Sequence, residues 1–290
     1  MKHEKEFFLK IIAAVALIAV AALVYGTLAI QSADARLDTQ GIILKSLNAG
    51  GSQQGQAQAE LAEISTIIIQ DSSKPELISL QPLVEQLKTL QGAEVISEKS
   101  LEKDSAEAIE LITKYNIDKL PAVLVQGETA KVETLAQNWS RLGSVEDDNT
   151  MVFRNVPPIY LELSTGNLRG EARAIYIAVP DKNEFFLASL YKQILANAFG
   201  IQLVDEKTID YNSSAGEALL AKYSINALPT ILLSGDLQAY TGFQEAWLQA
   251  GSIENDGNFI FRNLGLLQGL KYYDLNKGEV VEAVAPAQAQ

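Results

Sequence analysis

The sequence of 290 residues contains no cysteine and only one histidine. The first absence excludes disulfide bonds, thiolate nucleophiles and cysteine-ligated metals, and it removes the usual indication of the redox compartment. Basic residues are also scarce, since 23 lysines and arginines stand against 36 aspartates and glutamates, for a formal net charge of -13. Proteins that bind nucleic-acid backbones need clustered positive charge to displace counterions. We therefore expect no nucleic-acid partner.

A long apolar run without a charge extends from Ile11 to Ile30. A helix of about 20 residues spans roughly the 30 Å hydrocarbon core of a bilayer, so the run predicts a single transmembrane helix with the lipid bilayer as its partner. Lysines precede it, which places the N-terminus in the cytoplasm. The alternative is a cleaved signal peptide, because Ala33-Asp34-Ala35 has the small-x-small form of a cleavage site. Both interpretations place the rest of the chain outside the cytoplasm, at the cell membrane in the first case.

Composition changes again after this run. Residues 48–60 consist mainly of glycine, serine, glutamine and alanine, which cannot form a core and are typical of a flexible spacer. Two stretches of ordinary globular composition follow it. The predicted organisation is a tail and anchor over residues 1–35, a linker over 36–62, two domains over 63–168 and 169–284, and a short tail over 285–290.

The two predicted domains repeat one another. Residues 114–128 (KYNIDKLPAVLVQGE) align without a gap with residues 222–236 (KYSINALPTILLSGD), and in the same register Trp139 matches Trp247. Two copies of about 105 residues suit independent domains better than a solenoid, whose repeats are usually 20–50 residues long. The sequence therefore indicates a duplication.

Each copy shows the same order of hydrophobic patterns. A short β-branched run comes first, ISTIIIQ at 64–70 and AIYIAV at 174–179, and an amphipathic helix, a second strand and a second helix follow it. A third strand then begins at Pro121 and at Pro229. This β-α-β-α-β series with right-handed crossovers predicts an α/β fold with a small mixed sheet between helices.

The pattern Tyr-x-Ile-x-x-Leu-Pro ends at Leu120-Pro121 in the first copy and at Leu228-Pro229 in the second. In this context the chain resembles the thioredoxin-like superfamily. The resemblance implies two tandem thioredoxin-like domains, and it implies a cis bond before each proline, which X–Pro bonds tolerate. It also implies a groove beside each cis-proline loop, where an extended substrate segment pairs with backbone groups.

The resemblance further places a Cys-x-x-Cys motif where the first strand leads into the first helix. The matching positions contain no sulfur. We therefore expect a degenerate redox site with no catalytic residue, no cofactor and no metal. The positions are Ser72, Ser73, Lys74 and Pro75 in the first copy, and Asp181, Lys182 and Asn183 in the second.

A serine nucleophile is the alternative at the first of these sites. The only histidine, His3, lies in the N-terminal tail, and the sequence indicates no other base nearby. The simpler interpretation is that Asp71, Ser72 and Ser73 cap the first helix, with Pro75 near its first position.

Two other repeated features have a structural and a functional interpretation. Trp139 and Trp247 could line a binding groove, but aromatic residues on an amphipathic helix are usually core. Arg154 and Arg262 each follow an acidic turn that could hold a divalent cation. The turns lack the ligand spacing of a calcium loop, so we expect each arginine to pair with a turn carboxylate.

The sequence thus predicts a non-catalytic, membrane-anchored protein that binds or scaffolds an unknown exported protein or peptide, as an assembly factor or in a chaperone-like role. A purely structural spacer is equally compatible with the residues. The alternative from another class is a thiol–disulfide oxidoreductase family member whose cysteines have been lost or replaced.

Overall fold

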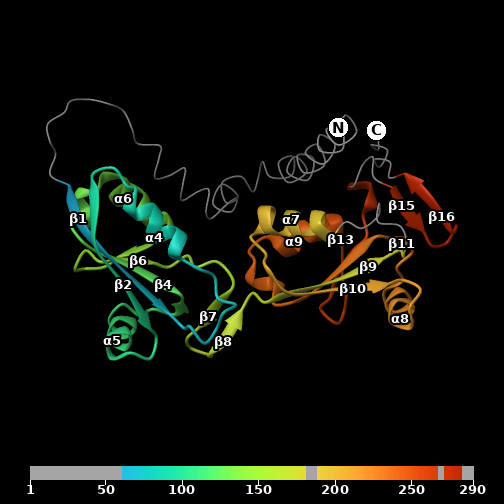
Figure 1. Ribbon diagram of the computed structural model, residues 1–290, viewed down its shortest axis with the longest axis horizontal. Coiled ribbons are helices and arrows are strands. Elements are labelled where there is room, and N and C mark those ends of the chain that lie inside the picture. The colour runs from blue at the N-terminus through green and yellow to red at the C-terminus, as the bar shows by residue number, and fades with distance from the viewer. Residues whose placement is uncertain (1–60, 181–187, 267–270, 283–290) are drawn as a thin grey trace, which may run out of the picture. The chain divides into compact units, whose positions relative to one another are not determined.

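A computed structural model describes residues 61–180, 188–266 and 271–282 (Figure 1). Within these ranges no helix is both long and apolar enough to cross a bilayer. The apolar run at residues 11–30 and the predicted linker lie outside the described residues. The described chain divides into two compact units, of which one ends at Arg169 and the other begins at Gly170. We call them the first and the second domain.

The first domain is a mixed α/β unit. Its elements in chain order are β1 (Ala62–Gln70), α4 (Gln81–Lys88), β2 (Ala93–Glu102), α5 (Ala106–Lys114), β3 (Lys119–Leu120), β4 (Ala122–Gly127), η1 (Thr129–Lys131), α6 (Glu133–Asn138), η2 (Trp139–Arg141), β5 (Gly143–Val145), β6 (Met151–Phe153), β7 (Tyr160–Glu162) and β8 (Asn167–Arg169).

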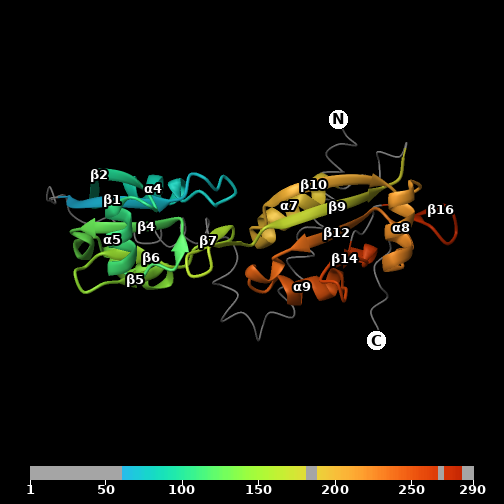
Figure 2. The same cartoon turned by 90° about the horizontal axis from the view of Figure 1, so that it is seen from below.

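A five-stranded sheet in the order β2-β1-β4-β6-β5 forms the centre of this domain. β1 and β2 are parallel, whereas β4 and β6 run antiparallel to their neighbours. The alternation along β1 sends Ile64 and Ile68 to the core under α4 and α6, and Ile67 and Ile69 to the core under α5. Helices therefore cover both faces of the sheet (Figures 1 and 2).

The second domain repeats this series. Its elements are β9 (Ala172–Ala178), α7 (Ala188–Phe199), β10 (Leu203–Asp210), α8 (Ser214–Tyr223), β11 (Ala227–Leu228), β12 (Thr230–Gly235), η4 (Leu237–Ala239), α9 (Phe243–Ala250), β13 (Gly251–Ile253), β14 (Phe259–Phe261), η5 (Leu264–Leu266), β15 (Lys271–Asp274) and β16 (Glu279–Glu282). The sheet order β10-β9-β12-β14-β13 matches that of the first domain strand for strand.

Each domain also ends in a hairpin that the predicted repeat did not include. β3, β7 and β8 form a three-stranded sheet, and so do β11, β15 and β16. The hairpin turns correspond, since Gly166 and Gly278 share a φ of 70° and bond back to Glu162 and Asp274, respectively. The segment before β15 is longer than the one before β7, so the gapless alignment loses the second hairpin.

The first helix begins later than the sequence predicts. α4 starts at Gln81, with Leu80 at the N-cap position and a proline in its first turn, so Asp71, Ser72 and Ser73 do not cap it. Asp71 instead closes a tight turn, because its Oδ1 accepts from the backbone N and the hydroxyl of Ser73 at 3.1 and 2.5 Å. A short side chain that bonds two residues ahead is as suited to a turn as to a helix cap.

An irregularity interrupts the outer strand of each sheet. The register along β2 skips Ile96, because Ile64 faces Val95 and the next residue, Ser65, faces Ser97. In β10 the register skips Val204 in the same way, between Leu203 and Asp205. Both residues are the extra members of a β-bulge, and they occupy equivalent places in the two domains.

Candidate functional site

The turn after β1 occupies the place where the resemblance puts the redox motif. Ser72, Ser73 and Pro75 are exposed and Lys74 is half-buried, whereas Asp71 is buried beneath them. Ser72 N donates to Glu102 Oε2 at 3.0 Å, which ties the turn to the end of β2. The turn is thus a well-bonded surface feature that presents small polar side chains.

The hydroxyl of Ser73 donates to the carboxylate of Asp71. Its hydrogen bond to Asp71 is the main reason why the pKa of that carboxyl is held below the usual value of 3.8, with a smaller contribution from the charge of Lys103. A carboxylate with a lowered pKa is a weak base near neutral pH. The pair closes the turn, because Asp71 accepts from both the hydroxyl and the backbone N of Ser73.

The counterpart of this turn in the second domain, Asp181, Lys182 and Asn183, lies outside the described residues.

The two prolines of the repeated motif are placed alike. The bonds Leu120–Pro121 and Leu228–Pro229 are both cis. Leu120 and Leu228 are completely buried, and each proline is buried between a two-residue strand and a central strand of the main sheet. The cis-proline loop is therefore built twice on the same frame.

The backbone edge in front of each cis-proline already has a partner. In the first domain Lys119 faces Glu162 and Leu120 faces Leu161, and the backbone N of Leu163 donates to the carbonyl of Asp118 at 2.9 Å. The chain's own β7 thus lies where the resemblance places an extended substrate segment.

The second domain fills the same edge with β15. Ala227 faces Asp274 and Leu228 faces Tyr273, and the backbone N of Leu275 donates to the carbonyl of Asn226 at 2.9 Å. Neither hairpin was predicted from the sequence. The signal that could have found them is a shared tyrosine, acidic residue and glycine, which are Tyr160, Glu162 and Gly166 in the first hairpin and Tyr272, Asp274 and Gly278 in the second. A segment that binds these edges from outside would have to replace a hairpin.

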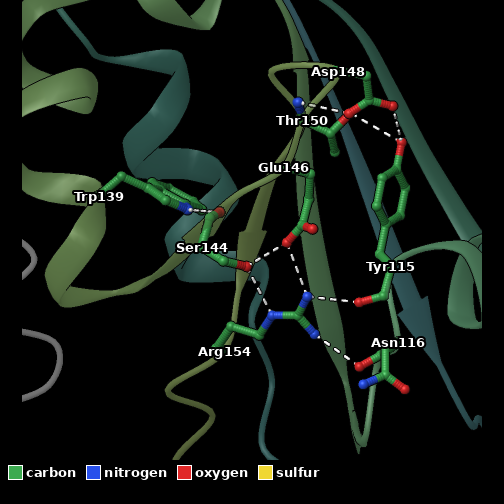
Figure 3. Close-up of polar contacts among 8 residues, drawn as sticks. All are labelled: Tyr115, Asn116, Trp139, Ser144, Glu146, Asp148, Thr150 and Arg154. Carbon is green, nitrogen blue, oxygen red and sulfur yellow. Dashed lines mark hydrogen bonds and ion pairs between the residues drawn. The ribbon is translucent and has the colours of Figure 1, made fainter.

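A repeated polar network joins the acidic turn to the second helix (Figure 3). In the first domain Arg154 donates to Ser144 Oγ at 2.9 Å, to Glu146 Oε1 at 2.9 Å, and to the carbonyls of Tyr115 and Asn116 at 2.6 and 2.9 Å. The planar guanidinium suits this arrangement, because its donors lie in one fixed fork. Arg154 therefore fastens the β5–β6 hairpin to the end of α5.

The second domain repeats the network with one contact fewer. Arg262 donates to Ser252 Oγ at 2.5 Å, to Glu254 Oε1 at 2.9 Å and to the carbonyl of Tyr223 at 2.7 Å. Ser224 corresponds to Asn116, and within the described residues Arg262 makes no hydrogen bond to it. The predicted pairing of each arginine with a turn carboxylate is confirmed.

Other residues identical in the two copies serve the same frame. Trp139 and Trp247 are buried, and the indole N–H of each donates to the carbonyl of Ser144 and Ser252 at 3.0 and 3.1 Å. Their predicted core position is confirmed, and a groove-lining role would require exposure that they lack.

The turn carboxylates are used within the protein. A hydrogen bond from Lys114 is the main reason why the pKa of Asp148 is held well below its usual range, and the Tyr115 hydroxyl adds to this effect. Lys222 lowers the pKa of Asp256 in the same way. Among the described residues no group of histidine, aspartate or glutamate side chains is arranged to hold a metal ion.

The comparisons with known proteins identify no family for this chain. No family model matches, and no curated protein does. Among solved structures, 14 chains match. They include ERdj5 in form II, with a TM-score of 0.18 and 12% identity, and human ERp44 in form I, with a TM-score of 0.15 and 11% identity.

These two matches, both thioredoxin-fold proteins, cover 67% and 62% of this chain, which in turn spans 27% of ERdj5 and 50% of ERp44. TM-scores of this size carry no argument about fold or activity.

Proposed function

We propose that this protein is a membrane-anchored, redox-inactive pair of thioredoxin-like domains that binds or scaffolds exported proteins. One observation carries the proposal. The frame that would hold a redox motif is built twice, with a cis-proline loop each time, in a sequence that contains no cysteine. Thiol–disulfide exchange proceeds through a thiolate and a mixed disulfide, and serine, lysine or proline cannot form that adduct. A scaffold without its chemistry can still serve as a binding module.

The proposed contact surface is the exposed turn after β1 rather than the edge before the cis-proline. Ser72, Ser73 and Pro75 are accessible there, and Lys74 adds a positive charge to a strongly acidic chain. The edge itself is paired with β7. A client would therefore meet the polar turn first.

The test of activity uses the unmodified protein. We expect no reduction of insulin disulfides and no oxidation of a dithiol peptide, and we expect slower aggregation of an unfolded client at a stoichiometric ratio. Lys74→Glu should weaken the protection, whereas Lys207→Glu on the exposed strand β10 is the control that should leave it unchanged. Disulfide turnover would overturn the proposal. Absence of client protection would favour the spacer interpretation.

The alternative, a degenerate oxidoreductase, is tested by restoring the motif. Ser72→Cys with Pro75→Cys recreates the Cys-x-x-Cys spacing in the exposed turn. Insulin reduction by this variant, with none by either single substitution, would favour an oxidoreductase ancestry and a recent loss of chemistry.

The anchor is proposed to be separable from the domains. Removal of residues 1–35 takes away the only long apolar run, and each domain keeps its own core. The shortened protein is expected in the soluble fraction with cooperative unfolding. Its retention in the membrane fraction would contradict this division.

A further inference from the structure

The hairpin at the end of the second domain is a self-contained element. β15 and β16 pair over four residues, from Lys271 facing Glu282 to Asp274 facing Glu279. Within the described residues its pairing to the rest of the domain is shorter, because it involves Ala227 and Leu228 of β11 and one further hydrogen bond, from Leu275 N to the carbonyl of Asn226. The hairpin can therefore leave β11 with its internal hydrogen bonds intact.

The first hairpin is held more firmly. Leu161 and the preceding Ile159 are only 3% and 4% exposed, and the carbonyl of Ile159 accepts from Ile78 N at 2.8 Å. The chain then continues through Gly170 and Glu171 directly into β9. Departure of this hairpin would uncover the core and would displace a central strand of the other domain.

The second hairpin is attached through less deeply buried side chains. Tyr273 and Leu275 pack against the core but are only partly buried, the Tyr273 ring lies 5.9 Å from that of Tyr211, and Val280 is 37% exposed. In the segment before it, Leu264 and Leu266 are partly buried against the core, and their backbone N groups bond to residues two or three positions earlier. Elements with little buried apolar surface and few long-range hydrogen bonds open most readily.

We propose that the β15–β16 hairpin is an exchangeable strap, whose place on β11 is taken by the same hairpin of a second copy of the chain. The edge accepts an extended segment with apolar residues at alternate positions, which the chain itself supplies at Tyr273 and Leu275. In an exchanged pair each strap makes with the partner copy the same contacts that it otherwise makes with its own domain. The interface therefore requires no new complementary surface. The proposal does not depend on client binding.

The absence of cysteine makes exchange directly measurable. Ala227 and Asp274 face one another, and the Leu275–Asn226 hydrogen bond falls on the adjacent pair, so they form a non-hydrogen-bonded pair. Such pairs hold their Cα atoms about 4.5 Å apart, within the range of a disulfide. Ala227→Cys with Asp274→Cys in one full-length chain should form a 227–274 disulfide on mild oxidation in detergent micelles, within one chain where the strap is unexchanged and between two chains where it is exchanged.

Exchange is then detected by mixing two single variants, A227C and D274C, before oxidation. In an equal mixture, random collision would give as much heterodimer as the two homodimers combined. Exchange should give more heterodimer than this, joined by the 227–274 disulfide. The matched pair in the first domain is Lys119 and Glu162, which face one another in the same way. Its variants K119C and E162C should give only the random proportion.

Three results would overturn the proposal. They are a random proportion of heterodimer from A227C and D274C, an equal excess from both pairs, and failure of the double variant to form any 227–274 disulfide, either within one chain or between two chains. Hydrogen exchange of the unmodified protein gives an independent measurement. The amide of Leu275 should exchange at least tenfold faster than that of Leu163, and equal protection would contradict an exchangeable strap.

Discussion

The two domains share one frame but fill it with different side chains. On the corresponding face of the sheet the first domain packs mainly aliphatic residues around Trp139 and Phe153, whereas the second packs an aromatic cluster. Phe243 lies 5.0 Å from Phe199, 5.5 Å from Trp247 and 5.6 Å from Phe259 between ring centroids. Protein cores tolerate the substitution of aliphatic by aromatic side chains when the total volume and the hydrophobic pattern are kept. The repeated polar network, rather than the core, therefore preserves the geometry of the duplication.

The largest expected effect tests the difference in core filling. Phe243→Ala should destabilise the second domain by about 3–5 kcal/mol, since Phe243 is fully buried among aromatic rings. The equivalent Leu135→Ala should cost the first domain about 2–3 kcal/mol, nearer the lower end of the range for leucine. Each domain contains one of the two tryptophans, so urea unfolding followed by fluorescence in Trp139→Phe or Trp247→Phe backgrounds reports on one domain at a time. An equal loss would remove the contrast between the cores.

The next prediction tests the identity of the frames. A Cβ on Gly143 would lie 1.9 Å from the carbonyl oxygen of Val152, and one on Gly251 would lie 1.9 Å from that of Ile260. Backbone must move in both cases, so Gly→Ala should destabilise both domains equally, by about 1–3 kcal/mol or more. Gly257→Ala is the control, because nothing lies within 4 Å and only its positive φ opposes substitution, at about 1 kcal/mol. Unequal losses at Gly143 and Gly251 would show that the hairpins are held differently.

A smaller effect separates the two arginines. Arg154→Lys loses the fork that reaches Tyr115 and Asn116, whereas Arg262→Lys loses one carbonyl contact fewer. We expect Arg154→Lys to cost its domain about 1 kcal/mol more than Arg262→Lys costs the other, which is the net value of one hydrogen bond. The measurement is the difference in urea midpoints between the paired variants. Equal losses would mean that the additional contact to Asn116 contributes nothing to stability.

The smallest effect is a pH dependence common to both domains. The hydrogen bond from Ser144 is the main reason why the pKa of Glu146 lies below its usual 4.5, and Ser252 acts likewise on Glu254. A lowered folded-state pKa stabilises the protein above 4.5, and this stabilisation is lost as the pH falls through the folded value. Both domains should therefore weaken in parallel below pH 4.5. Ser144→Ala should reduce the slope in the first domain only, and a reduction in both would contradict the local origin of the effect.

The sequence predicts the parts of this fold that depend on local pattern. The β-branched runs form β1 and β9, the tryptophans are core, and each arginine pairs with its turn carboxylate. The predicted start of the first helix was wrong, because an aspartate such as Asp71 accepts a hydrogen bond from two residues ahead in a turn as readily as at a helix cap.

The least predictable feature was the pairing of the edges before the cis-prolines. β3 and β11 are only two residues long, and their partners follow far along the chain in short hairpins. Strands of this length carry almost no periodic signal, and their pairing is decided by the tertiary fold. Whether the exposed turn at Ser72 and Ser73 binds a client depends on the partner's chemistry, which this sequence does not encode.

The bulge residues Ile96 and Val204 bear on the risk of aggregation while the protein folds. Among the described residues β2 and β10 are outer strands of the two five-stranded sheets, and an outer strand can recruit a strand from a neighbouring chain through its edge amides and carbonyls. Duplicated domains raise this hazard, because one copy can pair with the other during folding. A bulge at the same place in both edges breaks the straight ladder that an incoming strand needs, and charged side chains flank it at Glu94 and Asp205. Such bulges disfavour fibre-like association along the outer edges.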